Sequence, residues 1–82
     1  MSDPHTPATY TLDAGNLLCP MPVIRVQDRV AELHPGDRLE AIATDPGALQ
    51  DIPAWCRING HKVLETRQEG NRVVVVIEVG GG

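Results

Sequence analysis

Aromatic residues and cysteines are both scarce in this chain. Its 82 residues include one Tyr, one Trp and no Phe. The core must therefore be aliphatic, and a platform that stacks the bases of single-stranded RNA on aromatic rings is disfavoured. There are two cysteines, Cys19 and Cys56, whereas a disulfide-stapled secreted miniprotein normally carries about four or more. The chain is therefore not expected to be held together by disulfides.

Long apolar runs and an excess of positive charge are also missing. The longest wholly apolar run covers residues 73–77 and is too short to cross a bilayer. Residues 1–11 lack the apolar segment of a signal peptide, so we expect a soluble, cytoplasmic protein whose thiols stay reduced. With 7 basic and 11 acidic residues the net charge is −4, so direct binding to a nucleic acid or a membrane is not expected.

What is present is the composition of one small globular domain, with 41% hydrophobic and 22% charged residues. Residues 1–8 hold two prolines and no periodic pattern, so we predict a flexible tail there. A single α/β domain is predicted over residues 9–79, followed by a Gly tail over residues 80–82.

Apolar residues at steps of three and four predict a first helix. They lie on one stripe, and they are Val23, Val26, Val30 and Leu33. Pro20 suits the first helical position, and Pro22 falls within the first turn, where a missing amide donor costs nothing. Residues 34–36, His-Pro-Gly, end this helix.

A second helix is predicted between residues 45 and 60. Asp45 is the expected N-cap and Pro46 the first helical residue. Leu49, Ile52 and Cys56 share its apolar stripe, and the Asn-Gly pair at residues 59–60 ends it. Pro53 lies inside this helix and should kink it or split it into two turns.

Four β-prone segments complete the pattern, at residues 10–12, 38–44, 62–68 and 72–79, with a hairpin turn at Gly70-Asn71. The order β-α-β-α-β-β predicts an α/β fold, a two-layer sandwich with two helices on one face of a four-stranded mixed sheet. Alternation in the last strand leaves Val74 and Val76 on the outer face, either as ordinary surface valines or as a docking surface.

Cys19 stands directly before Pro20, at the start of the first helix. With Pro20 at the first helical position, Cys19 becomes the N-cap, and its sulfur lies beside free amide groups. These amides and the helix dipole favour a thiolate, so we expect a depressed thiol pKa, with Pro20 and Pro22 stiffening the turn. A thiolate is the form that attacks a sulfane sulfur. The alternative is a structural Cys19 that only fills space.

Residues 12–23, Leu-Asp-Ala-Gly-Asn-Leu-Leu-Cys-Pro-Met-Pro-Val, resemble the Cys-Pro-x-Pro region of the TusA/SirA-like sulfur-carrier family. Residues 44–47 and 51–56 are similar to the family's second block, so the resemblance covers residues 10–79. It implies the same sandwich fold. It also implies that a cysteine desulfurase or another sulfurtransferase loads the cysteine with sulfur, which passes to a downstream sulfur-accepting protein.

The resemblance makes Cys19 the persulfide carrier. It gives Asp13 the task of anchoring the segment before the cysteine, although a turn-forming Asp is an equal alternative. Arg25 is either a contact for an acidic partner surface or a solvated side chain. Where the family commonly has Gly, this chain has Asn16, and we expect the turn to survive because Asn tolerates positive φ.

Cys56 has two possible roles. We favour a buried structural residue on the second helix, because free cysteines are among the most buried residues. The alternative is a second reactive thiol that resolves the persulfide or forms a reversible disulfide with Cys19. The spacing of cysteines and histidines matches no metal site, so neither a metal nor a cofactor is expected.

Other functions remain open at this stage. The terminal glycines, residues 80–82, suit a thiocarboxylate carrier of the ubiquitin-like class, although those folds begin with a hairpin. An interaction or regulatory module without sulfur chemistry is a second possibility, and RNA binding is a third. Our prediction is a monomeric, sulfurtransferase-type carrier that serves tRNA thiolation, cofactor assembly or sulfur oxidation.

Overall fold

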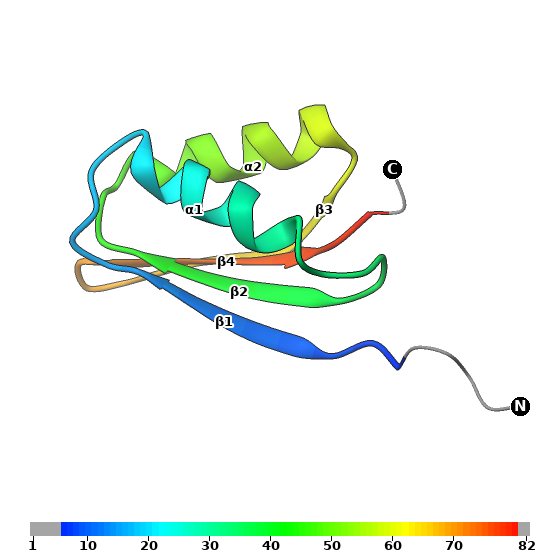
Figure 1. Cartoon of the computed structure of the whole chain (residues 1–82). Coiled ribbons are helices and arrows are strands. Elements are labelled where there is room, and N and C mark those ends of the chain that lie inside the picture. Colours follow the sequence, from blue (N-terminus) through cyan, green and yellow to red (C-terminus); the bar gives the residue numbers. More distant parts are fainter. Residues whose placement is uncertain (1–5, 81–82) are drawn as a thin grey trace, which may run out of the picture.

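The computed structural model describes residues 6–80. Its elements are β1 (Thr9–Ala14), α1 (Met21–Val30), β2 (Arg38–Ala43), α2 (Ala48–Asn59), β3 (Lys62–Glu69) and β4 (Arg72–Glu78). The strands form one sheet in the order β1-β2-β4-β3, with β1 parallel to β2 and the other neighbours antiparallel. Both helices cover the same face of this sheet (Figure 1). The predicted two-layer α/β sandwich is therefore confirmed.

The two predicted tails lie partly outside the described residues, which leave out 1–5 and 81–82. Within the described part, Ala8 already belongs to the sheet edge. Its N–H donates to a carboxylate oxygen of Asp37 at 3.1 Å, and its carbonyl accepts the N–H of Arg38 at 2.8 Å. Backbone pairing with β2 therefore begins one residue before β1 itself.

α1 begins one residue later than predicted. Pro20 is its N-cap, so Cys19 lies outside the helix, one position before the cap. The N–H of Met21 bonds to the carbonyl of Leu18 at 2.8 Å, and Ile24 makes the first bond that reaches back to Pro20, at 3.2 Å. The chain thus makes a separate turn at the cysteine before the helical ladder starts.

α2 also begins later than predicted, with Gly47 rather than Asp45 as its N-cap. The carbonyl of Asp45 accepts the N–H of Ala48 at 3.0 Å, and its carboxylate accepts that of Gly47 at 3.3 Å, which makes a turn ahead of the helix. Pro53 was expected to kink the helix or to split it, and the split does not occur, since α2 runs unbroken from Ala48 to Asn59. Gly60, with φ at 82°, ends α2 as predicted.

The core lies between the sheet and the helices and is aliphatic apart from one thiol. Its buried members are Val26, Val30, Leu39, Ala41, Ala43, Ala48, Ile52, Cys56, Val73, Val75, Ile77 and Val79. Tyr10 and Trp55 are only partly buried and pack against the margin of this cluster. The alternation predicted for the last strand is therefore correct on its helix-facing side.

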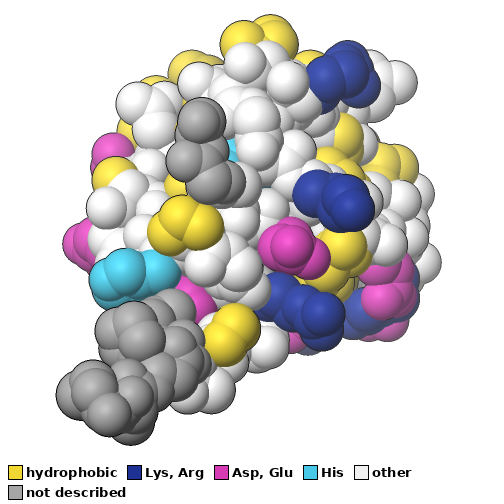
Figure 2. All heavy atoms as spheres, turned by 90° about the vertical axis from the view of Figure 1, so that its right-hand side faces the viewer, with side chains coloured by type: hydrophobic (Ala, Val, Ile, Leu, Met, Phe, Trp, Pro, Cys, Tyr) yellow, Lys and Arg dark blue, Asp and Glu magenta, His cyan; other side chains and the backbone are white. Residues whose placement is uncertain are grey.

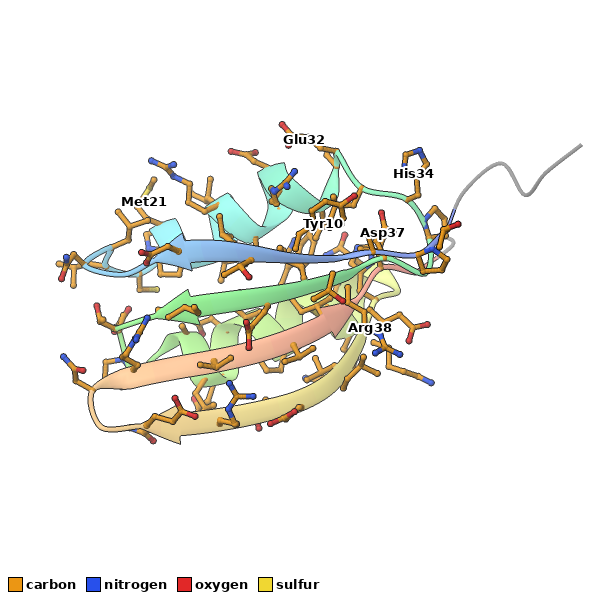
Figure 3. All side chains as sticks on the ribbon, turned by 90° about the horizontal axis from the view of Figure 1, so that it is seen from below. Tyr10, Met21, Glu32, His34, Asp37 and Arg38 are labelled. Carbon is orange, nitrogen blue, oxygen red and sulfur yellow. The ribbon has the colours of Figure 1, made fainter. Side chains whose placement is uncertain are left out.

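The outer face of the sheet, seen in Figure 3, corrects the prediction of an ordinary surface valine at position 74. Val74 is only 3% exposed there and is not a surface valine. The side chain of Arg67 on β3 reaches Glu40 on β2 at 3.3 Å, so it must cross β4, where Val74 is its pairing partner. Arg67 also pairs with Glu65 at 2.8 Å and Glu69 at 3.0 Å. The arginine stem covers the apolar surface and its charged head binds three carboxylates.

Asp37, to which the sequence analysis assigned no role, fastens the end of the fold farthest from the start of α1 (Figure 3). Its side chain is fully buried. The carboxylate accepts the N–H groups of Ala8 at 3.1 Å and His34 at 2.9 Å, and the carbonyl accepts that of Val79 at 2.8 Å. One residue thereby ties together the start of β1, the α1–β2 connection and the end of β4.

Candidate functional site

Cys19 lies in the connection between β1 and α1, which leaves the sheet at the carboxyl end of β1. Because β1 and β2 are parallel, the β2–α2 connection leaves the sheet at the same edge. Figure 1 shows these two connections together at the left, with the α1–β2 connection at the opposite end. Two segments distant in sequence therefore form the surroundings of the cysteine.

Two hydrogen bonds fix the cysteine loop to the β2–α2 connection. The N–H of Asn16 donates to Oγ1 of Thr44, and the N–H of Cys19 donates to Oδ2 of Asp45, both at 2.8 Å. Asn16 has φ at 66°, so it takes the left-handed conformation for which glycine is suited. The prediction that Asn preserves this turn is confirmed. The peptide bond between Cys19 and Pro20 is cis.

The sulfur of Cys19 is exposed and lies 3.3 Å from Oδ2 of Asp51. At this distance the thiol donates a hydrogen bond to the carboxylate. That bond raises the pKa of the Cys19 thiol above its ordinary value, and desolvation and the negative charges of Asp51 and Asp45 act in the same direction. The site holds its cysteine as a neutral thiol facing solvent.

The prediction of a depressed thiol pKa is therefore wrong. That argument required free amide N–H groups around the sulfur, but Pro20 and Pro22 have none. The N–H of Met21 is used within the loop, and that of Cys19 is used by a carboxylate. The same prolines that stiffen the turn thus remove the donors that would stabilise a thiolate. Meanwhile α2 and the connection before it supply two negative charges.

Three large apolar side chains follow or precede Cys19 in the chain and remain open to solvent. Leu18 is 74% exposed, Met21 37% and Ile24 41%. Met21 and Ile24 are three residues apart and share one face of α1. We call these three residues the apolar rim. Exposed apolar side chains close in sequence to an exposed thiol are typical of a surface that a partner protein covers.

Asp13 and Arg25 were also singled out in the sequence as candidate site residues. Asp13 accepts the N–H of Gly15 at 2.9 Å through Oδ1, which is the contact of a turn-forming Asp. Arg25 is exposed on α1, and Pro22 is buried under the start of that helix. The two prolines therefore differ in environment: Pro20 is the exposed N-cap of α1, whereas Pro22 packs in the interior.

Cys56 is fully buried in the core, as its place on the α2 stripe predicts. Burial raises the pKa of its thiol to about 11, so it stays protonated at neutral pH. Cys19, in contrast, is exposed. A resolving role for Cys56 would require it to leave the core, so its environment favours the structural interpretation.

The histidine that follows α2 is packed against a neighbouring aromatic ring. His61 stacks on Trp55 at 5.0 Å, and its Nδ1 accepts the N–H of Gly80 at 2.9 Å. Within residues 6–80, no three or more His, Cys, Asp or Glu side chains form a group that could hold a metal ion. Over the same stretch, neither helix has the length and apolar character needed to cross a lipid bilayer.

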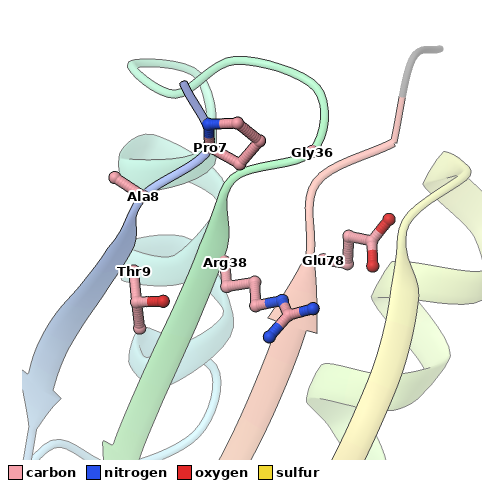
Figure 4. Close-up of a pocket in the computed structure, with 6 residues that line it drawn as sticks. All are labelled: Pro7, Ala8, Thr9, Gly36, Arg38 and Glu78. Atoms are coloured by element: carbon pink, nitrogen blue, oxygen red, sulfur yellow. The ribbon is translucent and has the colours of Figure 1, made fainter. Parts of the chain in front are cut away.

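A depression of about 350 Å³ lies at the end of the fold opposite to Cys19. Figure 4 shows the residues that line it, which are Pro7, Ala8, Thr9, Gly36, Arg38 and Glu78. Figure 2 looks onto this end, where basic and acidic side chains are interspersed. The residues that line this depression include no cysteine, so the exposed thiol of the cysteine loop is the candidate site.

Sequence reasoning missed the two carboxylates that define the chemistry of Cys19. It assigned Asp45 to a helix cap and gave Asp51 no role. The available signal was topological, because both residues follow the second strand of a parallel pair and therefore reach the edge at which Cys19 lies. Cys19 donates a hydrogen bond to each of them, its N–H to Asp45 and its thiol to Asp51, so this edge is one site.

Comparisons with known proteins agree with this geometry. Residues 10–79 match the family described as Sulfurtransferase TusA. The sulfur carrier protein TusA of Pseudomonas aeruginosa (strain LESB58) is 45% identical over 58 residues, which cover 71% of this chain and 73% of that protein. The sulfur carrier protein TusA of Pseudomonas paraeruginosa is 43% identical over 63 residues, covering 77% and 80%.

Two further comparisons extend the match. YrkF of Bacillus subtilis is 40% identical over 74 residues, which cover 90% of this chain but only 40% of YrkF. The crystal structure of a SirA-like protein from Desulfitobacterium hafniense has a TM-score of 0.76 and 25% identity, covering 87% of this chain and 97% of that one. The family match runs from β1 to β4 and includes Cys19. The chain belongs to the TusA family of sulfur carriers.

Proposed function

We propose that Cys19 accepts sulfane sulfur as a persulfide from a cysteine desulfurase or another sulfurtransferase and relays it to an acceptor protein. The observation that carries this proposal is the exposed sulfur of Cys19 on a loop fixed by backbone hydrogen bonds. Among the described residues, the other thiol, Cys56, is buried. A carrier needs a thiol that two successive partners can reach, and Cys19 meets that need.

The chemistry is an exchange between sulfur atoms. In loading, the Cys19 sulfur bonds to the outer sulfur of the donor persulfide, and the donor sulfur leaves with the electron pair of the broken S–S bond. In unloading, an acceptor thiolate attacks the same outer sulfur, and Cys19 is the leaving group. Neither step is a net oxidation or reduction, so the proposed relay needs no metal and no cofactor.

The apolar rim is the proposed contact for both partners, because its residues are exposed and lie near Cys19 in the chain. The flexible thioether of Met21 suits a surface that receives more than one partner. Arg25, exposed on the same helix, can pair with an acidic residue at the margin of such an interface. Ile24→Asp should therefore slow loading by a protein donor and leave loading by a small-molecule persulfide unchanged.

Which sulfur pathway the carrier serves depends on its partner proteins and not on the carrier itself. Thiolation of tRNA, cofactor assembly and sulfur oxidation can all use the same persulfide chemistry. We place the carrier in the cytoplasm as a monomer, since a free thiol persists in a reducing compartment. Its net charge of −4 disfavours direct contact with nucleic acid. Isolation of the proteins bound to the Cys19 persulfide from cells would identify the pathway.

The decisive experiment loads the protein with labelled sulfur from cysteine through a cysteine desulfurase and locates the label by mass spectrometry. We expect one added sulfur atom, removable by reductant, on the peptide that contains Cys19. Cys19→Ser should abolish it, and Cys56→Ala is the matched control that should retain it. Exchange of oxygen for sulfur at Gly82 would instead identify a thiocarboxylate carrier. Absence of any label would favour an interaction module.

A further inference from the structure

Asp51 presents a carboxylate directly to the sulfur of Cys19. It is the fourth residue of α2, and its N–H bonds to the carbonyl of Gly47 at 2.9 Å, so the first turn of a helix positions it. The cysteine loop is tied to the same connection through Asp45 at 2.8 Å. Both sides of the 3.3 Å contact between Sγ and Oδ2 are therefore held by the backbone.

This arrangement creates a chemical requirement. The charged groups that act on the sulfur are the carboxylates of Asp51 and Asp45. They keep Cys19 as a thiol, which protects an exposed cysteine from oxidation and from unspecific alkylation. Sulfur exchange, however, proceeds through the thiolate. A proton must therefore leave Cys19 when a donor arrives, and the carboxylate that already accepts a hydrogen bond from the thiol is that of Asp51.

We propose that Asp51 is the proton acceptor, a catalytic residue that takes the proton of Cys19 during loading and returns a proton during unloading. The inference rests on the proposed role of Cys19 as the persulfide carrier. A carboxylate is a weak base toward a resting thiol. It becomes an adequate one as the new S–S bond forms and makes the S–H proton more acidic.

The loading step balances as follows in atoms and electrons. The S–H proton of Cys19 passes to Oδ2 of Asp51 while Sγ bonds to the outer sulfur of the donor persulfide. The S–S bond of the donor breaks, the donor sulfur leaves with the electron pair, and it takes the proton back from Asp51. Thiol plus donor persulfide thus gives Cys19 persulfide plus donor thiol, with the carboxylate restored.

Unloading uses the same group in reverse. The acceptor thiol releases its proton to Asp51 directly or through water, and its sulfur bonds to the outer sulfur of the Cys19 persulfide. The Cys19 sulfur leaves with the electron pair and receives the proton from Asp51. A thiolate of raised pKa leaves slowly, so protonation of the departing sulfur matters more here than for an ordinary cysteine.

The test compares wild type, Asp51→Asn, and the matched variant Asp28→Asn, which changes an exposed carboxylate on the other helix, α1. Loading uses glutathione persulfide, so partner docking plays no part. Alkylation by iodoacetamide measures thiolate availability in parallel. Loading rates are measured from pH 6 to 9 and expressed as the ratio of wild type to variant. Ionisation of the donor affects both rates equally, so it cancels in this ratio.

Asp51→Asn should accelerate alkylation at pH 7, since one negative charge and one hydrogen bond that favour the thiol are gone. It should nevertheless slow loading by at least about tenfold at pH 7, the lower range of general-base effects. The wild-type advantage should shrink as the pH approaches the thiol pKa. Asp28→Asn should match wild type in both assays.

Two other results would distinguish failure of the proton-transfer proposal from failure of the carrier role. If Asp51→Asn loads as fast as wild type or faster at pH 7, Asp51 only suppresses the thiolate and the proton-transfer proposal is wrong, while the carrier role stands. If wild type itself takes up no sulfur on Cys19, the carrier role falls. Asp51→Ala, with circular dichroism spectra of every variant, distinguishes a lost proton acceptor from a lost fold.

Discussion

Removal of the Asp37 carboxylate should weaken the fold without touching the cysteine loop. Asp37 is fully buried. It lies at the end of the fold away from Met21, the first residue of α1 (Figure 3). Asp37→Ala leaves the N–H groups of Ala8 and His34 without the acceptor that they now share. Asp37→Asn keeps one oxygen but turns an NH₂ group toward the second donor, so it should lose about half as much.

The size of the effect follows from these two hydrogen bonds. A bond to a charged group contributes about 1.5–3 kcal/mol, and the two bonds share one acceptor, so we expect a loss of about 3 kcal/mol for Asp37→Ala. A domain of this length shifts its melting temperature by about 4–8 °C per kcal/mol. The expected decrease is therefore about 15 °C.

Urea unfolding followed by the fluorescence of Trp55 measures this directly, because Trp55 is the single tryptophan and packs against the core. Asp28→Ala, on the exposed face of α1, is the control and should change the free energy of unfolding by less than about 0.5 kcal/mol. A loss below about 1 kcal/mol for Asp37→Ala would refute the idea that this carboxylate fastens β1. So would a variant Asp37→Asn that is less stable than Asp37→Ala.

Three further predictions concern the core and the surface. Between pH 9 and about 11 the free energy of unfolding should fall, because the pKa of the Cys56 thiol is 9.0 in the unfolded chain and about 11 in the folded one. In urea unfolding measured over this pH range, Cys56→Ala should reduce the fall. Gly80→Ala should displace its segment, seen as altered amide chemical shifts at Gly60, because the new Cβ would collide with the Gly60 carbonyl oxygen. Arg67→Ala should lower the free energy of unfolding in urea, and added salt should recover part of the loss by screening the three carboxylates left behind.

Hydrophobic periodicity predicted the six elements in their correct order, because each helix and strand buries one face against the same core. It was less accurate at the helix starts. Asp45 and Pro46 have the residue types of a cap and a first helical position, but the carboxylate of Asp45 is used by Gly47 and Cys19 instead. A capping preference describes what a side chain can accept, and the fold decided which donor it meets.

The candidate site shows the same contrast between what a local segment indicates and what tertiary contacts decide. Cys19, the two prolines and the turn at Asn16 were all visible in one short segment. The electrostatic conclusion drawn from that segment was nevertheless reversed, because the groups that act on the sulfur come from another part of the chain. Val74 is a similar case, since alternation correctly put it on the outer face but could not reveal the arginine that covers it.

The sequence by itself determined what depends on near neighbours: the element order, the faces that point inward, the positive φ at Asn16 and a cysteine held at the head of a helix. Tertiary structure decided the ionisation of that cysteine. Its hydrogen-bond partners, Asp45 and Asp51, are 26 and 32 residues away, and parallel pairing of β1 with β2 brings them to the sulfur. Charge acts through space over a few ångströms, so chain neighbours alone cannot reveal the pKa of an atom that lies where two connections meet.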